Sequence, residues 1–139
     1  MSSAPSLGQE IVTERRTITE ADVVLYAGLS GDFHPAHTDE VYAVSSVFGK
    51  RVVHGLLTLS LSQGLLMRTG LRNYISALIG IDKVKFLFPV YPSDTVRSVF
   101  RVAELRPRRR SQLCGSWFCM PRSTRSLVTE LFSNTNRLT

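Results

Sequence analysis

The sequence predicts an α+β fold in which an antiparallel β-sheet curls around one long, buried helix. Residues 55–71 are 17 residues with a single charge, Arg68, and their leucines point in nearly all directions of a helix, so something must cover it. The second half of the chain reads as a series of strands, and such a sheet needs one covered face. The length of 139 residues favours a single domain over residues 1–139, with residues 1–8 as a flexible N-terminus.

Local patterns place the individual elements. The expected helices cover residues 20–29, 39–46 and 55–71. The expected strands cover residues 10–16, 83–88, 95–105, 111–120 and 127–135. Thr19 and Asp22 form a capping-box pattern at the start of the first helix. Gly31 and Pro35 end that helix, because Gly permits unusual backbone angles and Pro restricts the residue before it.

Composition and termini exclude several classes of protein. Hydrophobic residues make up 43% and charged residues 20% of the chain, which is ordinary for a globular protein. The N-terminus lacks the basic start and apolar stretch of a secretory signal, and no segment has the apolar length of a membrane span. Two cysteines are too few for a disulfide framework. A soluble, cytoplasmic protein is therefore expected.

The positive charge is concentrated at one end of the chain. The formal net charge is +6, whereas residues 97–139 alone carry nine Arg, no Lys and two Glu, densest at residues 106–110. Such a cluster is typical of a solvated turn, or of a surface that binds nucleic acid, an anionic membrane or a phosphorylated small molecule. Aromatic stacking platforms and reading motifs are missing, so we expect neither nucleic acid nor a membrane as partner.

Asp32 and His37 are the candidate catalytic residues. They lie five apart in a turn constrained by Gly31 and Pro35, and a turn can point both side chains at one spot. A carboxylate beside an imidazole can hold one water and pass protons. Gly55 opens the long helix, so its main-chain N–H is free to bind an oxygen that gains negative charge, and the missing Cβ permits close approach of a ligand.

The surrounding motif resembles a known family. The segment Asp32-x-His34-Pro35-x-His37 is preceded by Ser30-Gly31 and followed, further on, by Val53-His54-Gly55. This pattern is similar to that of the MaoC-like (R)-specific enoyl-CoA hydratases and dehydratases, and the resemblance covers about residues 7 to 105. It implies the hot-dog fold, which agrees with the predicted layout, and assembly as a homodimer or a higher homo-oligomer. It also implies reversible syn addition of water to a trans-2-enoyl thioester, giving the (R)-3-hydroxyacyl thioester.

The resemblance also implies roles for individual residues. The family's catalytic pair falls on Asp32 and His37, and its oxyanion donor falls on the N–H of Gly55. The supporting turn of the active site contains Ser30, His34 and Pro35. The family commonly has Asn where this chain has His34, which leaves the pH optimum and the substrate class open. No separate cofactor or metal is expected, because coenzyme A is part of the substrate.

The substrate carrier is expected to be coenzyme A or an acyl carrier protein. Coenzyme A carries a 3′-phosphate and a pyrophosphate, for which arginine is well suited. Arg108, Arg109 and Arg110 are therefore candidate contacts to these phosphates.

Three other interpretations remain open at this stage. His34, His37 and His54, with Asp32 or Asp39, could supply metal ligands, although their spacing matches no strong zinc signature. Hot-dog thioesterases commonly carry a catalytic carboxylate on the central helix, and residues 55–71 contain no Asp or Glu. A protein that binds acyl thioesters without catalysis is the remaining alternative.

Overall fold

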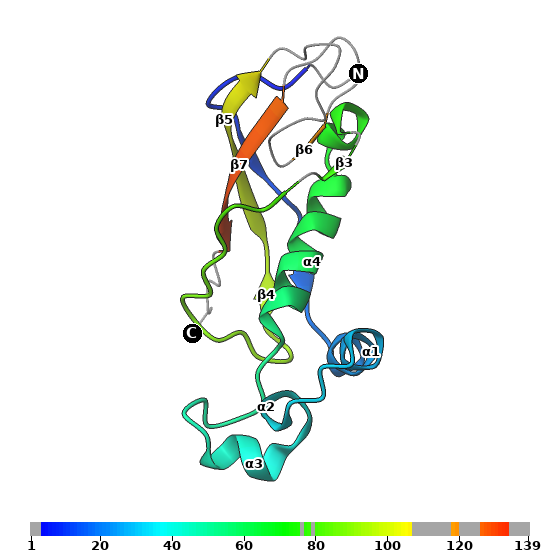
Figure 1. Ribbon diagram of the computed structural model, residues 1–139, viewed down its shortest axis with the longest axis vertical. Coiled ribbons are helices and arrows are strands. Elements are labelled where there is room, and N and C mark those ends of the chain that lie inside the picture. Colours follow the sequence, from blue (N-terminus) through cyan, green and yellow to red (C-terminus); the bar gives the residue numbers. More distant parts are fainter. Residues whose placement is uncertain (1–3, 76, 79, 107–117, 120–125, 134–139) are drawn as a thin grey trace. The chain divides into compact units, whose positions relative to one another are not determined.

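The structure is a computed structural model that describes residues 4–75, 77–78, 80–106, 118–119 and 126–133. Its helices and strands belong to two compact units (Figure 1). The sheet unit consists of Met1–Glu14, Gly64–Lys85 and Ser98–Ser133. The site unit consists of Arg15–Gln63, Phe86–Arg97 and Asn134–Thr139. The long helix α4 (Gly55–Met67) contributes its first part to the site unit and its last turn to the sheet unit.

The sheet unit contains a five-stranded antiparallel sheet with the strand order β1-β5-β7-β6-β3. Its strands are β1 (Glu10–Val12), β3 (Ala77–Leu78), β5 (Ser98–Arg106), β6 (Phe118–Cys119) and β7 (Ser126–Ser133). β5 and β7 lie side by side (Figure 1), and their ladder is irregular between Val102 and Glu104. The core of this unit brings together four buried side chains, Leu66, Leu71, Phe100 and Val102. The last turn of α4 therefore packs against the sheet.

The N-terminal segment is tied to this sheet by main-chain hydrogen bonds. The N–H of Gln9 donates to the carbonyl of Ser6, and the N–H of Gly8 donates to the carbonyl of Val102. The sequence predicts a flexible terminus through residue 8, yet residues 6 and 8 take part in these bonds.

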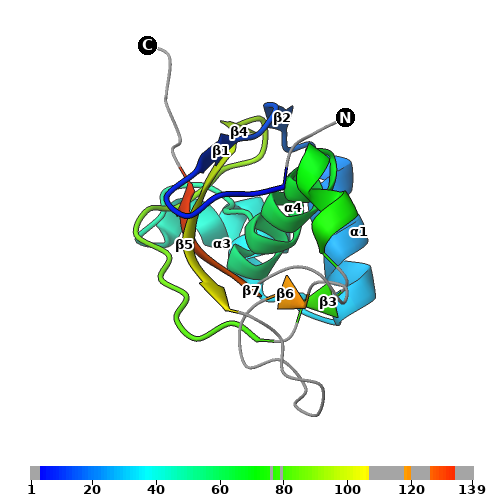
Figure 2. The same ribbon diagram turned by 90° about the horizontal axis from the view of Figure 1, so that it is seen from above.

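The site unit consists of three short helices, the first part of α4 and a pair of antiparallel strands. The pair is formed by β2 (Arg16–Thr17) and β4 (Thr95–Val96), which lie side by side in Figure 2. The helices are α1 (Glu20–Ser30), α2 (Pro35–Thr38) and α3 (Glu40–Ser45). Its main core consists of Ile18, Val23, Val53, Leu57, Leu61, Val90 and Val96. α4 thus contributes buried leucines to both units, Leu57 and Leu61 to one and Leu65 and Leu66 to the other, which agrees with its apolar sequence.

The predicted start of α1 is confirmed in detail. The side chain of Thr19 accepts the N–H of Asp22, and the carboxylate of Asp22 accepts the N–H of Thr19 at 2.8 Å. This bond from the Thr19 main chain is the main cause that lowers the pKa of Asp22 below its ordinary value, and Arg16 adds to it. Val23 and Ala27 lie on the buried face of this helix.

The long helix ends four residues earlier than the sequence predicts. The hydroxyl of Thr69 donates to the carbonyl of Leu66 and accepts the N–H of Leu71, which starts the 3₁₀ helix η1 (Gly70–Tyr74). A side chain that competes for helix carbonyls in this way ends a helix that periodicity alone would continue. None of the helices in the described part of the chain has the length and apolar character that a membrane crossing requires.

The strand predicted over residues 83–88 is wrong, because these residues are exposed and form no ladder. Alternation shows which face a strand would bury, but a strand also needs a neighbour with free N–H and C=O groups. The strand predicted over residues 95–105 is interrupted at Arg97, where the chain passes from β4 to β5. The strand predicted over residues 127–135 corresponds to β7, and most of the one over residues 111–120 lies outside the described residues.

Candidate active site

The turn after α1 begins with a tight reversal of the main chain. Gly31 adopts the left-handed conformation with φ of 76°, and its N–H donates to the carbonyl of Ala27 at 2.8 Å. The hydroxyl of Ser30 donates to the carbonyl of Tyr26 and accepts the N–H of Asp32 at 3.2 Å. These bonds place Asp32 directly beyond the helix, and a positive φ favours Gly at position 31.

His34 and Pro35 then start the short helix α2. Pro35 occupies the first helical position, where its missing N–H has no cost. The Nδ1 atom of His34 accepts the N–H of Ala36 at 3.1 Å, so His34 is the N-cap. The carboxylate of Asp32 accepts the N–H of His34 at 3.2 Å. The predicted supporting turn is therefore present, and the imidazole of His34 provides the hydrogen-bond acceptor that an Asn would offer there.

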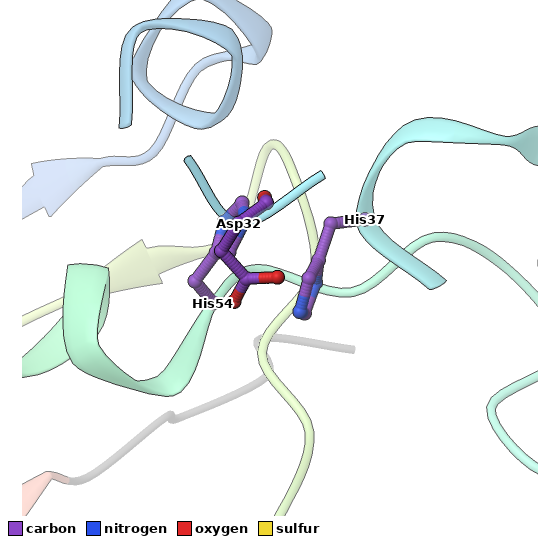
Figure 3. A group of neighbouring side chains, drawn as sticks. All are labelled: Asp32, His37 and His54. Carbon is purple, nitrogen blue, oxygen red and sulfur yellow. The ribbon is translucent and has the colours of Figure 1, made fainter. Parts of the chain in front are cut away.

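The structure brings Asp32, His37 and His54 together (Figure 3). One polar atom from each side chain lies within 4.8 Å of those of the other two. The Nδ1 atom of His37 lies 2.7 Å from the carbonyl oxygen of Val52. Because a carbonyl can only accept, Nδ1 carries the hydrogen and Nε2 of the neutral ring has the free lone pair. Asp32 is exposed and His37 is half-buried, so the pair is open to a ligand.

His54 has a larger part in the site than the sequence indicates. In the sequence it is part of the Val53-His54-Gly55 motif and one of several candidate metal ligands, with no role of its own assigned. In the structure its ring stacks on His37, with centroids 3.8 Å apart and an interplanar angle of 29°. Its Nε2 atom lies 3.0 Å from the carbonyl oxygen of Asp32. The one signal in the sequence is its position directly before the helix that carries Gly55.

Gly55 lies at the first position of α4, as predicted. The first bond inside this helix runs from the N–H of Thr58 to the carbonyl of His54, so the N–H of Gly55 has no acceptor within the helix. A Cβ atom at Gly55 would come within 2.9 to 3.0 Å of the ring of Phe86. Sequence reasoning assigned this close approach to a ligand and missed Phe86, because nothing in the sequence relates two residues 31 positions apart.

An ion-pair network ties the helices around the turn together. The guanidinium of Arg51 donates two hydrogen bonds to Glu20 of α1, at 2.8 and 3.0 Å, and one to Glu40 of α3, at 2.7 Å. These bonds raise the pKa of Arg51, Glu40 having the largest effect, so its charge is fixed. The next residue, Val52, is the one whose carbonyl holds His37. Arg51 therefore links both helices to the segment that orients the imidazole.

The group formed by Asp32, His37 and His54 has the residue types of a metal site. Both histidines also donate their other ring N–H to main-chain carbonyls, as metal-binding histidines commonly do. One polar atom from each of the three side chains lies within 4.8 Å of the other two, so the group remains a candidate metal site. A water held between Asp32 and His37 is the alternative occupant.

One set of predicted contacts cannot be placed. Arg108, Arg109 and Arg110 lie outside the described residues.

Comparison with known proteins places this geometry in a family. The family model described as "MaoC like domain" matches residues 2–114. Protein MaoC of Klebsiella aerogenes is 46% identical over 90 residues, which are 65% of this chain and 27% of that protein. The (R)-specific enoyl-CoA hydratase of Rhodospirillum rubrum is 38% identical over 106 residues, 68% of this chain and 65% of that protein. The match thus spans less than two thirds of either relative.

A third relative and two solved structures agree with this placement. The (R)-specific enoyl-CoA hydratase of Aeromonas caviae is 37% identical over 106 residues, covering 75% of this chain and 77% of that protein. A structure described as a monoamine oxidase regulatory protein from Archaeoglobus has a TM-score of 0.69 at 30% identity, covering 93% of this chain and 88% of that one.

The second structure shares the fold alone. It is a Mycobacterium tuberculosis protein described as having a double hot-dog fold, with a TM-score of 0.56 at 18% identity, covering 91% of this chain and 38% of that one. The predicted hot-dog fold is therefore confirmed. On the family model and the relatives together, the chain belongs to the MaoC-like hydratase and dehydratase family.

Proposed function

We propose that this protein is a hydro-lyase that reversibly hydrates a trans-2-enoyl-CoA to an (R)-3-hydroxyacyl-CoA. The approach of the Asp32 carboxylate to the imidazole of His37 carries the proposal. Two relatives named (R)-specific enoyl-CoA hydratase and one named 3-hydroxybutyryl-CoA dehydratase support it, at 36 to 38% identity. The match to the family model assigns the chain to the hydratase and dehydratase family, and the specific reaction is the proposal.

We propose that one bound water bridges the two groups. A water that makes two hydrogen bonds of about 2.8 Å at a near-tetrahedral angle spans about 4.6 Å between its partners. The polar atoms of Asp32 and His37 lie within 4.8 Å of each other. Since Nδ1 of His37 is engaged with Val52, the Nε2 atom is the one that can receive a hydrogen from this water.

The reaction requires one exchangeable proton on the pair. The water oxygen bonds to C3 of the substrate while one member of the pair takes a proton from the water. The other member delivers its proton to C2, so the C2–C3 double bond becomes a single bond and the thioester is kept. The pair ends with as many protons as it began with. Because the Nδ1 hydrogen of His37 is held by Val52, the exchangeable proton moves only through Nε2 and the Asp32 carboxylate.

The N–H of Gly55 is proposed to stabilise the charge that forms on the thioester oxygen. Addition at C3 moves negative charge onto that oxygen, and a free N–H at the start of α4 lies at the positive end of the helix dipole. Loss of one such donor costs roughly 3 kcal/mol of barrier in other enzymes.

The rest of the proposal concerns the thioester carrier, the oligomeric state of the protein and its location in the cell. The thioester carrier is coenzyme A or an acyl carrier protein, and no cofactor besides the substrate takes part. Arg108, Arg109 and Arg110 are proposed to contact the phosphates of coenzyme A. We further propose that the protein acts as a homodimer in the cytoplasm.

Hydration of crotonyl-CoA tests the proposal, followed as loss of the absorbance of the conjugated thioester. Asp32→Asn keeps an oxygen that can accept the N–H of His34, and His37→Asn keeps an N–H that can donate to Val52. Both variants are therefore expected to fold. Each should lose about 10²- to 10⁴-fold in kcat, because each removes one partner of the proton transfer.

Asp39→Asn is the matched control. Asp39 is a nearby carboxylate that caps α3 through the N–H of Tyr42, and Asn caps a helix equally well. This variant should keep the activity of the wild type. Activity that persists in both Asp32→Asn and His37→Asn would rule out the pair as the catalytic groups. A folded wild type that turns over no short, long or branched enoyl thioester would instead be a protein that only binds acyl thioesters.

A further inference from the structure

His54 is a buried imidazole to which the proposed reaction gives no task. Its exposed fraction is 2%. One face of the ring stacks on His37, and Tyr26 lies near the ring at a centroid distance of 5.0 Å. Its Nε2 atom lies 3.0 Å from the main-chain oxygen of Asp32. His54 thus contacts both members of the proposed catalytic pair.

The direction of this hydrogen bond follows from its partner. The carbonyl of Asp32 can only accept, so Nε2 of His54 carries the hydrogen and donates it. The Nδ1 atom of the neutral ring then has a lone pair, and this atom is buried with no hydrogen-bond partner among the described residues. A buried acceptor without a partner destabilises a fold, so an apolar ring would suit this position better on stability grounds alone.

Asp32 depends on this bond for its support. Its N–H donates to the hydroxyl of Ser30, and its carboxylate accepts the N–H of His34, both within the same turn. Of the hydrogen bonds that the described part of the chain gives Asp32, the bond from His54 is the one that comes from outside this turn. The turn is exposed, so an anchor at the buried His54, directly before α4, restrains it relative to Gly55.

We propose that His54 is a positioning residue, which holds the main chain of Asp32 through its Nε2–H. The proposal rests on the proposed hydratase function. It deepens that function by naming what sets the distance between the two catalytic groups. A displacement of about 1 Å at such groups can lower a rate about 100-fold.

Two variants separate the hydrogen bond from the ring. His54→Gln keeps an N–H donor at the position of Nε2 and removes the ring, whereas His54→Phe keeps a ring and removes the donor. We expect His54→Phe to lower kcat on crotonyl-CoA about 10- to 100-fold with KM changed less than about threefold. We expect His54→Gln to retain more than a third of the wild-type kcat.

A purely structural role would give a different pattern. In that case His54→Phe, which fills the space and removes the unpartnered Nδ1, would be as active and at least as stable as the wild type. Equal loss of kcat in both variants would also overturn the proposal, because the donor would then not matter.

A second measurement does not depend on activity. The chain has three histidines, so nitrogen-15 labelling of histidine gives three ring systems in long-range proton–nitrogen NMR spectra. At about pH 8.5, where imidazoles are mostly neutral, His54 should be the Nε2–H tautomer and His37 the Nδ1–H tautomer. An Nδ1–H tautomer of His54 would overturn the proposal even if the protein is active. The expected tautomers in a protein inactive on every enoyl thioester would leave the anchor in place and reject the hydratase function.

Discussion

His34 caps the helix that carries His37 through a ring nitrogen. An acceptor at this position is needed for the N–H of Ala36, and Asn can supply it as well as His. We expect His34→Asn to unfold in urea with the wild-type free energy at about pH 8, and His34→Ala to lose about 1 kcal/mol.

The measurement is the difference in free energy of unfolding between each of the two variants and the wild type at about pH 8. Equal stability of His34→Ala and wild type at high pH would show that the cap contributes nothing.

The same residues show how far sequence reasoning reaches at this scale. Asp32 and His37 could be predicted to meet because Gly31 and Pro35 fix the turn between them, and both are close in the chain. The role of His54 could not, since its partner is a main-chain carbonyl 22 residues away. Any residue type offers such a carbonyl, so the sequence contains no mark of it.

At the scale of elements, the start of α4 depends on an aromatic ring from a distant segment. The ring of Phe86, whose exposed fraction is 58%, occupies the space that a Cβ at Gly55 would need. We expect Gly55→Ala to lower the free energy of unfolding, because the ring must move. The same substitution should cost less in a Phe86→Ala background, with a coupling of about 0.5–1 kcal/mol in a double-mutant cycle.

Urea unfolding of the two single variants, the double variant and the wild type measures this coupling. If the changes in free energy of unfolding of Gly55→Ala and Phe86→Ala simply add, the ring of Phe86 moves freely out of the way. Glycine would then be needed at position 55 for another reason. Activity of the double variant then separates the two reasons for the glycine. A stable but inactive double variant would place the requirement at the substrate.

Local signals account for the elements that could be predicted. The capping box of α1 and the Asp39 cap of α3 lie within four residues of the helices that they start, so sequence alone locates them. The segment over residues 83–88 has a clear alternation and still forms no strand. Strand formation depends on a partner elsewhere in the chain or in another chain, and periodicity contains no information about that partner.

At the scale of the whole molecule, α4 has a stripe of exposed residues in the part of the chain that the structure describes. Leu56, Ser60 and Gly64 are exposed at successive turns of the helix. The helix has no charged residue, whereas a helix face in contact with water normally carries charges. The sequence predicts that something covers this helix all round, and the open stripe is where the cover is incomplete. A second copy of the chain is the proposed cover, because symmetric pairs are the commonest assemblies.

Sedimentation velocity tests this assembly, and we expect a species of about twice the 15.5 kDa of the chain. Ser60→Arg should shift it to the monomer, because a long cation would lie in the middle of the open stripe. The hydroxyl of Ser60 donates only back to the carbonyl of Leu56 in its own helix, so its loss leaves the fold intact. Ser6→Arg adds the same charge at another exposed position and should remain a dimer. A wild type that sediments as a monomer at micromolar concentration, or a Ser60→Arg variant that stays dimeric, would show that the stripe faces solvent.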